Sequence, residues 1–366
     1  MLNSTRKTKV LFVDLGATFG GAEVYLLRLL LSLRQEIDCH VLCCQKDLES
    51  SLRQLGIPYT SIFSGTGLLK ILQLVWAAGV ITRLLLSRRI DTLQINGYSE
   101  IVFVPLARML GRRAVPTRHL GFDIEAEHWY QAPGRYLARW LYQWLAGTAT
   151  RVVCVSAEVG REAEALAPGR VQVIPNWVDV PPFFVRSPIV ETRQFTILFV
   201  GRMVPYKGMQ LVLEAMRAFP MRNIPVTLIA VGDGPHRHEL ERLAEGLNVK
   251  FMGFHRDVVP FYKEADLLVT PSLGPEGSSL VTLEAMAHGL PCLLSDLPVH
   301  REIAREGAIA GLFRSGDAED LASQMKHLLN DEALRGLRAV EAHSLVHAEH
   351  NGDLAVEAYR RVLTHG

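Results

Sequence analysis

Apolar and polar positions follow two alternating periods along this chain. Short runs rich in Val, Ile, Leu and Phe are typical of buried strands, and the longer stretches between them repeat apolar residues every three or four positions, as amphipathic helices do. Strands that alternate with helices are typical of βαβ units and a parallel sheet. The predicted strands cover residues 10–14, 38–43, 91–95, 114–117 and 151–156, then 195–201, 226–231, 249–252, 267–269 and 291–295, with a helix such as 23–33 between strands.

The strands fall into two sets, separated by residues 174–182, whose prolines and lost periodicity mark a linker. A chain of 366 residues is long enough for two domains. We therefore predict an α/β protein with two Rossmann-like, doubly wound domains, residues 1–182 and 183–347, facing across a cleft. Ligands of such domains bind at the carboxyl ends of the strands.

Charge is distributed unevenly along the chain. The net charge of +1 does not favour a nucleic-acid binder. Residues 1–188 contain 21 Lys and Arg against 15 Asp and Glu, which leaves 18 and 23 for the remainder. The basic first half either favours an anionic acceptor or a membrane surface, or is ordinary solvated surface.

Three further features bear on location. The longest hydrophobic segment, 68–86, is interrupted by Lys70 and Arg83 and falls short of the roughly 20 unbroken apolar residues of a spanning helix, so we predict a buried helix. The first apolar run ends at Asp14, too early for a signal peptide. The five cysteines form no Cys-x-x-Cys pair and most lie in strand-like runs, which predicts buried free thiols in a reducing cytoplasm.

The stretch 275–289, Pro-Glu-Gly-Ser-Ser-Leu-Val-Thr-Leu-Glu-Ala-Met-Ala-His-Gly, places Glu276 before an apolar helix and Glu284 inside it. A helix rises about 1.5 Å per residue, so the two carboxylates would lie roughly 10 Å apart and suit two ends of one extended polar ligand. The amides of residues 277–280 would face an anion between them, because a helix start has unpaired N–H donors. A nucleotide-sugar has this layout of sugar hydroxyls, diphosphate and ribose diol.

Two cations follow the predicted strand 195–201, Arg202 directly and Lys207 shortly after it. Such a pair either neutralises a diphosphate leaving group, where charge develops in the transition state, or lies on the surface. The turn 232–235, Gly-Asp-Gly-Pro, permits close approach of the backbone and a proline at a helix start, and it is also ordinary turn chemistry.

Glycines also open the first helix of the chain, where Gly20 and Gly21 would let the backbone approach a phosphate or a sugar. Their spacing from Gly16 does not match Gly-x-Gly-x-x-Gly, and no acidic residue clearly ends a second strand, so dinucleotide binding is disfavoured. His119 follows the strand 114–117 and is a candidate for the cleft, although a lone His is more often a packed or surface residue.

In their order and spacing these motifs resemble the retaining glycosyltransferases of family 4, which have the two-domain GT-B fold. The matching stretches are residues 20–23, 117–119, 155–156, 174–176, 200–202 with 207–208, 232–235, 253–254, 265–266, 271–272 and 276–289. The resemblance implies transfer of a sugar from a nucleotide-sugar donor with retention of anomeric configuration, with no obligatory metal and no cofactor. It also implies that a last helix, within residues 348–366, crosses back to the first domain.

The resemblance further assigns roles to single residues. Arg202 and Lys207 hold the diphosphate, and Glu284 takes the ribose hydroxyls. Glu276 takes the donor sugar, together with the loop amides of Gly277, Ser278, Ser279 and Leu280. Phe254 and His255 flank the base, and His119 touches the sugar near the reacting centre. Gly21 approaches the phosphate, and Gly20 and Gly232 are further donor contacts. The candidate catalytic residues are therefore Glu276, Arg202, Lys207 and His119.

Two positions depart from the family pattern. Trp177 replaces the common glycine after Ile-Pro-Asn, and Gly277 replaces the usual aromatic residue after the first glutamate. The first departure concerns the packing of the hinge, and the second concerns which sugar hydroxyls are bound. The identity of the donor therefore stays open.

Residues 128–144 mix Trp and Tyr with arginines on a predicted helix of the basic half. This segment either lies at a membrane interface or packs its aromatic residues under the sheet. Together with the uneven charge, it favours a glycan or lipid-linked acceptor in cell-envelope polysaccharide or lipopolysaccharide synthesis, and a cytoplasmic protein at the inner membrane surface. The alternatives are a sugar-nucleotide epimerase or phosphorylase on the same fold, and a non-catalytic nucleotide-binding protein.

Overall fold

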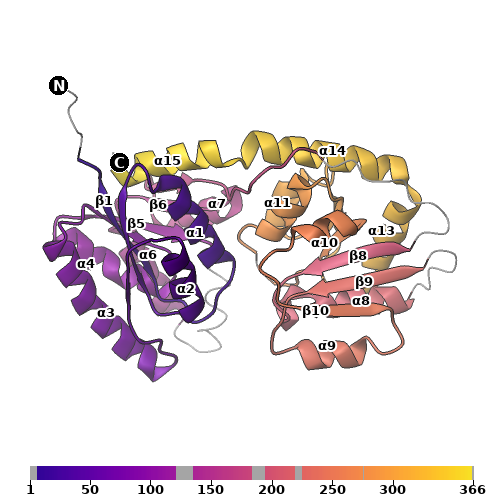
Figure 1. Cartoon of the computed structure of the whole chain (residues 1–366), viewed down its shortest axis with the longest axis horizontal. Coiled ribbons are helices and arrows are strands. Elements are labelled where there is room, and N and C mark those ends of the chain that lie inside the picture. The colour runs from indigo at the N-terminus through magenta and orange to yellow at the C-terminus, as the bar shows by residue number, and fades with distance from the viewer. Residues whose placement is uncertain (1–5, 121–134, 184–193, 219–224, 275, 365–366) are drawn as a thin grey trace. The chain divides into compact units, whose positions relative to one another are not determined.

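A computed structural model of the chain describes residues 6–120, 135–183, 194–218, 225–274 and 276–364. The chain divides into two compact units, one formed by Met1–Asn176 with Gly352–Gly366 and the other by Trp177–Asn351. Figure 1 shows both units and labels many of their helices and strands. Each unit is built around one parallel sheet, which confirms the predicted α/β class.

The first sheet has the strand order β3-β2-β1-β4-β5-β6-β7 among the described residues, and its paired strands run parallel. The chain builds outward from β1 in one direction, then returns to the other side of β1 at β4, as doubly wound sheets do. The strands are β1 Lys9–Asp14, β2 Asp38–Cys43, β3 Tyr59–Ser61, β4 Thr92–Ile95, β5 Arg113–Arg118, β6 Val152–Cys154 and β7 Val171–Val173. The sequence did not predict the short edge strands β3 and β7.

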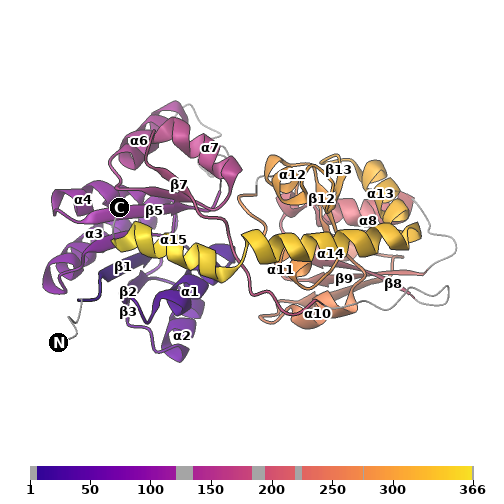
Figure 2. The same cartoon turned by 90° about the horizontal axis from the view of Figure 1, so that it is seen from above.

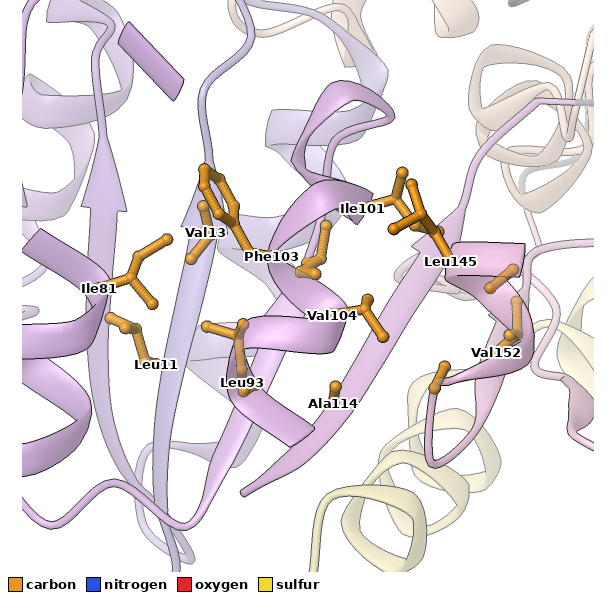
Figure 3. Packing of buried hydrophobic residues seen from close by; sticks show 14 of the residues in the cluster. Leu11, Val13, Ile81, Leu93, Ile101, Phe103, Val104, Ala114, Leu145 and Val152 are labelled. Atoms are coloured by element: carbon orange, nitrogen blue, oxygen red, sulfur yellow. The ribbon is translucent and has the colours of Figure 1, made fainter. Parts of the chain in front are cut away.

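Helices cover this sheet on both faces. The helices of the first unit are α1 Gly21–Leu33, α2 Lys46–Gln54, α3 Leu68–Ser87, η1 Ser99–Val102, α4 Phe103–Met109, α6 Arg135–Gly147, α7 Ala157–Leu166 and α15 Gly352–Thr364. One apolar cluster joins α3, α4, α6 and α7 to the strands, with Ile81, Val104 and Leu145 among its members (Figure 3). Their shared core places the four helices on the same side of the sheet.

The last helix, α15, packs on the first unit although it follows the second in sequence. It contacts α1, β4 and β5 (Figure 2). Thr92 Oγ1 donates to the carbonyl of Leu363 at 2.8 Å, and the hydroxyls of Thr117 and the buried Tyr359 are 3.2 Å apart. The first unit is therefore completed by the C-terminal segment.

The second sheet has the order β10-β9-β8-β11-β12-β13 within the part of the chain that is described, again with parallel pairs. Its strands are β8 Phe195–Val200, β9 Val226–Val231, β10 Val249–Gly253, β11 Leu267–Thr270, β12 Cys292–Ser295 and β13 Gly311–Phe313, the last of which was not predicted. One face packs against α8 Met209–Ala218, α9 Arg237–Leu243 and α13 Ala318–Asn330, and the other against α10 Val259–Glu264, α11 Leu280–Ala287, α12 Pro298–Ala304 and α14 Glu332–Glu349; η2 Pro205–Lys207 follows β8.

The structure tests the predicted burial of the five cysteines and of segment 68–86. The five cysteines are buried free thiols, as predicted. Segment 68–86 does form a helix, α3, but the prediction that it is buried is wrong. Ala77, Ile81 and Leu85 enter the core, whereas Leu68 and Val75 are 84% and 68% exposed. Because its inner and outer faces are both apolar, hydrophobicity alone could not show which residues are covered.

The predicted aromatic face at 128–144 is only partly visible, because residues 121–134 lie outside the described part of the chain. In α6 the ring of Tyr142 is buried, whereas Trp140 and Trp144 are 60% and 54% exposed. Packing under the sheet therefore holds for Tyr142 and not for the two tryptophans. The predicted linker 174–182 has neither helix nor strand, and Val178 N in it donates to the carbonyl of His350 at 3.0 Å.

Candidate active site

The predicted site of the second unit forms where the strand order reverses, between β8 and β11. Ligands of doubly wound folds bind at this switch point. The loops that follow the two strands are joined there, since Leu273 N donates to the carbonyl of Tyr206 at 2.8 Å. Lys207 Nζ lies 2.5 Å from Glu276 Oε1, and Ser272 Oγ donates to the same oxygen at 2.6 Å. Two residues predicted from separate motifs thus form one ion pair.

Glu276 is charged despite its burial. Burial raises the pKa of its carboxyl, but the charges of Lys207 and His300 and the hydrogen bonds from Lys207 and Ser272 outweigh burial, so the pKa lies below its ordinary value. The Glu276 side chain is 8% exposed and that of Lys207 is 26% exposed. The site thus holds a fixed carboxylate beside a partly accessible ammonium group.

His300, which sequence reasoning missed, is a buried residue near this carboxylate. The ring is fully buried, and its Nδ1 lies 2.9 Å from the carbonyl of Ser295 and 3.1 Å from the hydroxyl of the same residue. Burial lowers the pKa of His300 below its ordinary value, and the charge of Glu276 offsets only part of this effect. The position of His300 just beyond a predicted strand end was the available signal.

The second predicted cation, Arg202, is exposed, and its guanidinium donates to the hydroxyl of Tyr206 at 2.9 Å. The Arg202 guanidinium and the Lys207 ammonium lie 6.0 Å and 5.8 Å from the centre of the Tyr206 ring. The side chain of Tyr206, another residue that was not predicted, therefore lies next to both cations. Two positive charges in a small volume suit an anion with several oxygens.

The glycine turn after β9 packs against the loop after β8. Gly232 has φ +132°, and a Cβ there would lie 2.0 Å from the carbonyl oxygen of Gly201. A Cβ at Gly234 would lie 2.3 Å from the carbonyl oxygen of Met203. The close approach that was predicted for these glycines is thus made to neighbouring backbone, and it fixes the loop that carries Arg202.

The second glutamate, Glu284, lies in α11 as predicted, after the loop that carries Glu276. Tyr262 Oη donates to Glu284 Oε2 at 2.9 Å, which orients the carboxylate. Ser279 caps α11, because its side chain accepts a hydrogen bond from Thr282 N. The other predicted loop residues, Gly277 and Ser278, precede this cap, and Leu280 is the first residue of the helix.

Phe254 and His255, the predicted contacts of the base, follow β10. The Phe254 side chain is 62% exposed. The ring of His255 lies edge-on to Phe261 with 5.0 Å between the centroids, and its Nε2 is 3.2 Å from the carbonyl of Met252. An exposed aromatic ring beside a strand end is available for stacking on a flat ligand.

The first unit has its own polar cluster at the switch point between β1 and β4. Asn96 Nδ2 donates to Asp14 Oδ2 at 2.7 Å, and Asn96 Oδ1 lies 2.9 Å from Nε2 of the predicted His119. His119 lies edge-on to Tyr25, with 4.8 Å between the ring centroids. Burial lowers the pKa of His119 to about 4, so the imidazole is neutral at physiological pH.

The buried carboxyl group of Glu23 holds the predicted glycine turn, and its charge interacts with that of the buried Asp14. Gly20 N donates to Glu23 Oε2 at 2.7 Å, and Gly21 begins α1. Burial and the charge of Asp14 raise the pKa of Glu23 to about 8. Burial, aided by the charge of Glu100, raises the pKa of Asp14 to about 6. Asp14, Asn96 and Glu100 were not predicted as site residues, although polar residues at the ends of two apolar strands were a usable signal.

The fold and the two switch-point clusters define the class of protein: two doubly wound domains, one of which holds paired cations beside a glutamate loop. A family model described as "Glycosyltransferase Family 4" matches residues 19–181, and one described as "Glycosyl transferases group 1" matches residues 194–331. The chain belongs to the GT-B glycosyltransferases of family 4.

Among curated relatives, the chain is 33% identical over 181 residues to phosphatidyl-myo-inositol mannosyltransferase of Mycobacterium leprae, which is 48% of each chain. It is 26% identical over 247 residues to an Escherichia coli UDP-Gal:alpha-D-GlcNAc-diphosphoundecaprenol alpha-1,3-galactosyltransferase, covering 62% of this chain and 63% of the relative. The chain spans about half the length of the first of these relatives.

Solved structures share the fold. Anabaena Alr3699/HepE in complex with UDP superposes with a TM-score of 0.81 at 21% identity, over 98% of this chain and 100% of that one. Sucrose-phosphate synthase from Thermosynechococcus elongatus has a TM-score of 0.80 at 17% identity, over 98% and 100% of the two chains. At these identities the likeness concerns the fold.

Proposed function

We propose that this protein transfers a sugar from a nucleotide-sugar donor to a glycan or lipid-linked saccharide, with retention of anomeric configuration. The observation that carries the proposal is the ion pair formed by Lys207 and Glu276 at the β8/β11 switch point. Arg202 donates a hydrogen bond to Tyr206, whose ring also lies next to Lys207. A carboxylate for sugar hydroxyls and two cations for a diphosphate are what a nucleotide-sugar requires at its reacting end.

In the proposed reaction the bond between the anomeric carbon and the diphosphate oxygen breaks, and the acceptor oxygen forms a bond to the same face of that carbon. The acceptor proton passes to the departing diphosphate. Arg202 and Lys207 stabilise the negative charge that develops on the diphosphate, so we propose that no metal is required.

The remaining predicted residues have roles in the donor complex. Glu276 would bind the sugar hydroxyls, together with the amides of Gly277, Ser278, Ser279 and Leu280. Glu284, oriented by Tyr262, would bind the ribose diol, and Phe254 and His255 would flank the base. In the first unit, Gly20 and Gly21 would approach the phosphate, and neutral His119 would donate or accept a hydrogen bond at the sugar. In the second unit, Gly232 would keep the loop that carries Arg202 in place.

The names of similar proteins support the donor and the acceptor class. The HepE structures contain UDP or UDP-glucose, and the M. leprae and E. coli relatives are named for acceptors with a lipid anchor. We therefore propose a role in cell-envelope glycan or glycolipid synthesis, by a cytoplasmic protein located peripherally at the inner membrane surface.

Calorimetric titration with UDP, GDP, ADP and NAD, followed by the matching sugar nucleotides, tests the proposal. One nucleoside diphosphate should bind to the wild type, and Arg202→Ala should weaken its binding by roughly 10-fold or more, because a charge-assisted contact to phosphate is lost. Transfer by the wild type should persist with a metal chelator present. Under the same conditions Glu276→Gln and Lys207→Ala should each abolish transfer, while their circular dichroism spectra stay unchanged. Binding of NAD alone, or transfer by the Glu276→Gln/Lys207→Ala variant, would reject the assignment.

A further inference from the structure

The outer face of α3 is apolar where it should meet water. Between positions 68 and 76, six apolar side chains are more than half exposed: Leu68, Leu69, Ile71, Leu72, Val75 and Trp76. Single exposed apolar residues are ordinary on soluble proteins, but a contiguous patch marks an interaction surface. The surface formed by these six residues is called the α3 face below.

The inner face of the same helix is already committed to the fold. Ala77, Ile81 and Leu85 are fully buried in the core of the first unit. The side-chain amide of the buried Gln73 donates to the carbonyl of Phe63 at 2.8 Å, and Lys70 Nζ donates to the carbonyl of Leu15 at 2.7 Å. By length and composition α3 is apolar enough to cross a membrane, but only 28% of that window is buried and the buried part fills the core. The α3 face is therefore available to a partner without α3 leaving its unit.

Neighbouring helices on the same side of the sheet extend this surface. α3 contacts α4, and α4 contacts α6. Met109 in α4 is 85% exposed, and Trp140 and Trp144 in α6 project outward as well. Tryptophan is enriched where a protein meets the interfacial region of a bilayer.

Charge identifies the partner. The segments α3, α4 and α6 contain no Asp or Glu. Of the exposed cations in this part of the described chain, Arg83 lies in α3, Arg88 and Arg89 follow its last residue, and Arg108 lies in α4. The two acidic residues between positions 62 and 120 are neutralised internally, since Asp91 lies 3.4 Å from Arg6 and Glu100 lies 3.6 Å from Lys70. An apolar face on helices whose charged residues are all cations fits a bilayer that contains anionic lipids.

The position of the α3 face agrees with a lipid-linked acceptor. The first turn of α3 is tied to the carboxyl end of β1, because Lys70 binds both the carbonyl of Leu15 and the carboxylate of Glu100. Glu100 in turn accepts a hydrogen bond from Leu15 N at 3.1 Å. Leu15 follows Asp14, a member of the polar cluster that contains His119. The apolar half of α3 thus begins at the edge of the sheet where the first unit holds its candidate site residues.

We propose that the α3 face, with the exposed side chains of α4 and α6, docks the protein on an anionic lipid bilayer. The helices lie along the surface, with the α3 face among the headgroups and upper acyl chains and the arginines at lipid phosphates. This proposal deepens the peripheral location proposed above and rests on that part of the proposed function, not on the transfer reaction.

Vesicle sedimentation of the full chain tests the docking surface. Vesicles of phosphatidylcholine with about 30% phosphatidylglycerol should bind the wild type, and vesicles of phosphatidylcholine alone should bind it roughly 10-fold less. The double variant Leu72→Glu/Val75→Glu places two carboxylates in the α3 face and should lower binding to the anionic vesicles by about 10-fold or more. In vesicles with brominated acyl chains, quenching of tryptophan fluorescence should decrease in Trp76→Phe, although that variant still binds.

A matched control lies on α14 of the second unit, where Leu337 and Val340 are 56% and 49% exposed at the same spacing. Leu337→Glu/Val340→Glu should bind vesicles as the wild type does. Equal binding by both double variants, with unchanged circular dichroism, would overturn the proposal. The proposal would also be overturned if the wild type is a dimer that does not bind vesicles and if Leu72→Glu/Val75→Glu is a monomer. In that case a second copy of the chain would cover the α3 face. Vesicle binding requires no donor, so failure of the nucleotide screen leaves this result readable.

Discussion

At the scale of single residues, the buried carboxyl groups after β1 give the protein a measurable pH dependence. The pKa of Glu23 rises from 4.5 to about 8 through burial and the charge of Asp14. Between these two values the folded state binds more protons than the unfolded state, so this group's contribution to the free energy of unfolding falls as pH rises. Its stabilising effect is complete below about pH 4.5 and is lost by about pH 8.

Glu23→Gln should remove this slope, because the amide stays neutral and can still accept the hydrogen bond from Gly20 N. Urea unfolding at low and high pH should show the variant close to the wild type near pH 5 and roughly 1–3 kcal/mol more stable above pH 8. The wild type serves as its own control across the pH series. A stability difference that does not change with pH would show that Glu23 is already ionised in the folded state.

Sequence motifs named the candidate site residues but could not show which of them are in contact. Lys207 and Glu276 could be predicted separately, since each belongs to a short motif next to a strand end. Their direct contact could not, because they are separated by 69 positions in sequence. Asn96 escaped prediction for the same reason: its partner Asp14 lies 82 positions away, and only the β1–β4 pairing brings the two together.

At the scale of elements, the loops of the second unit depend on glycines that meet other backbone. A methyl group at Gly232 would lie 2.0 Å from the carbonyl oxygen of Gly201, in a backbone conformation with φ +132° that side chains rarely adopt. Gly232→Ala should therefore lower the free energy of unfolding by about 3 kcal/mol or more, since strain and overpacking add. Thermal unfolding of the variant checks the stability, and nucleotide titration checks the neighbouring loop.

Gly246 provides the control for this prediction. Its φ is +81°, but a Cβ there would meet no heavy atom within 4 Å. Gly246→Ala should cost only the conformational strain, about 1 kcal/mol. If both variants lose the same stability, the contact with Gly201 is relieved by a small backbone movement and the loop after β8 is not rigid.

Apolar runs predicted ten of the strands but not β3, β7 and β13, which have three residues each and include polar residues or glycine. β6 also has three residues, but it could be recognised because it lies within the apolar run 152–155. The exposure of α3 was missed for a different reason. Its inner and outer faces have similar hydrophobicity, so its orientation follows from tertiary contacts such as that of Lys70 with Leu15.

At the scale of the whole molecule, the first compact unit is built from two segments that are far apart in the sequence. Residues 352–366 belong to the first compact unit, although they follow the second in sequence. Family resemblance indicated such a closing helix, but periodicity alone could not, because an amphipathic pattern does not specify which sheet a helix covers. Stability of the first unit should therefore depend on its distant C-terminal segment.

Tyr359 in α15 tests this dependence. The side chain is fully buried, its ring lies 6.0 Å from that of Tyr25, and its hydroxyl is 3.2 Å from Thr117 Oγ1. Tyr359→Ala should destabilise the first unit by about 3–5 kcal/mol through the cavity it creates, and Tyr359→Phe by about 1–2 kcal/mol through the lost hydroxyl. Hydrogen exchange should accelerate in β1, β4 and β5 and stay unchanged in β8 to β13. Equal acceleration in both sheets would mean that the two units unfold as one cooperative body, in which case α15 stabilises the whole chain rather than the unit on which it packs.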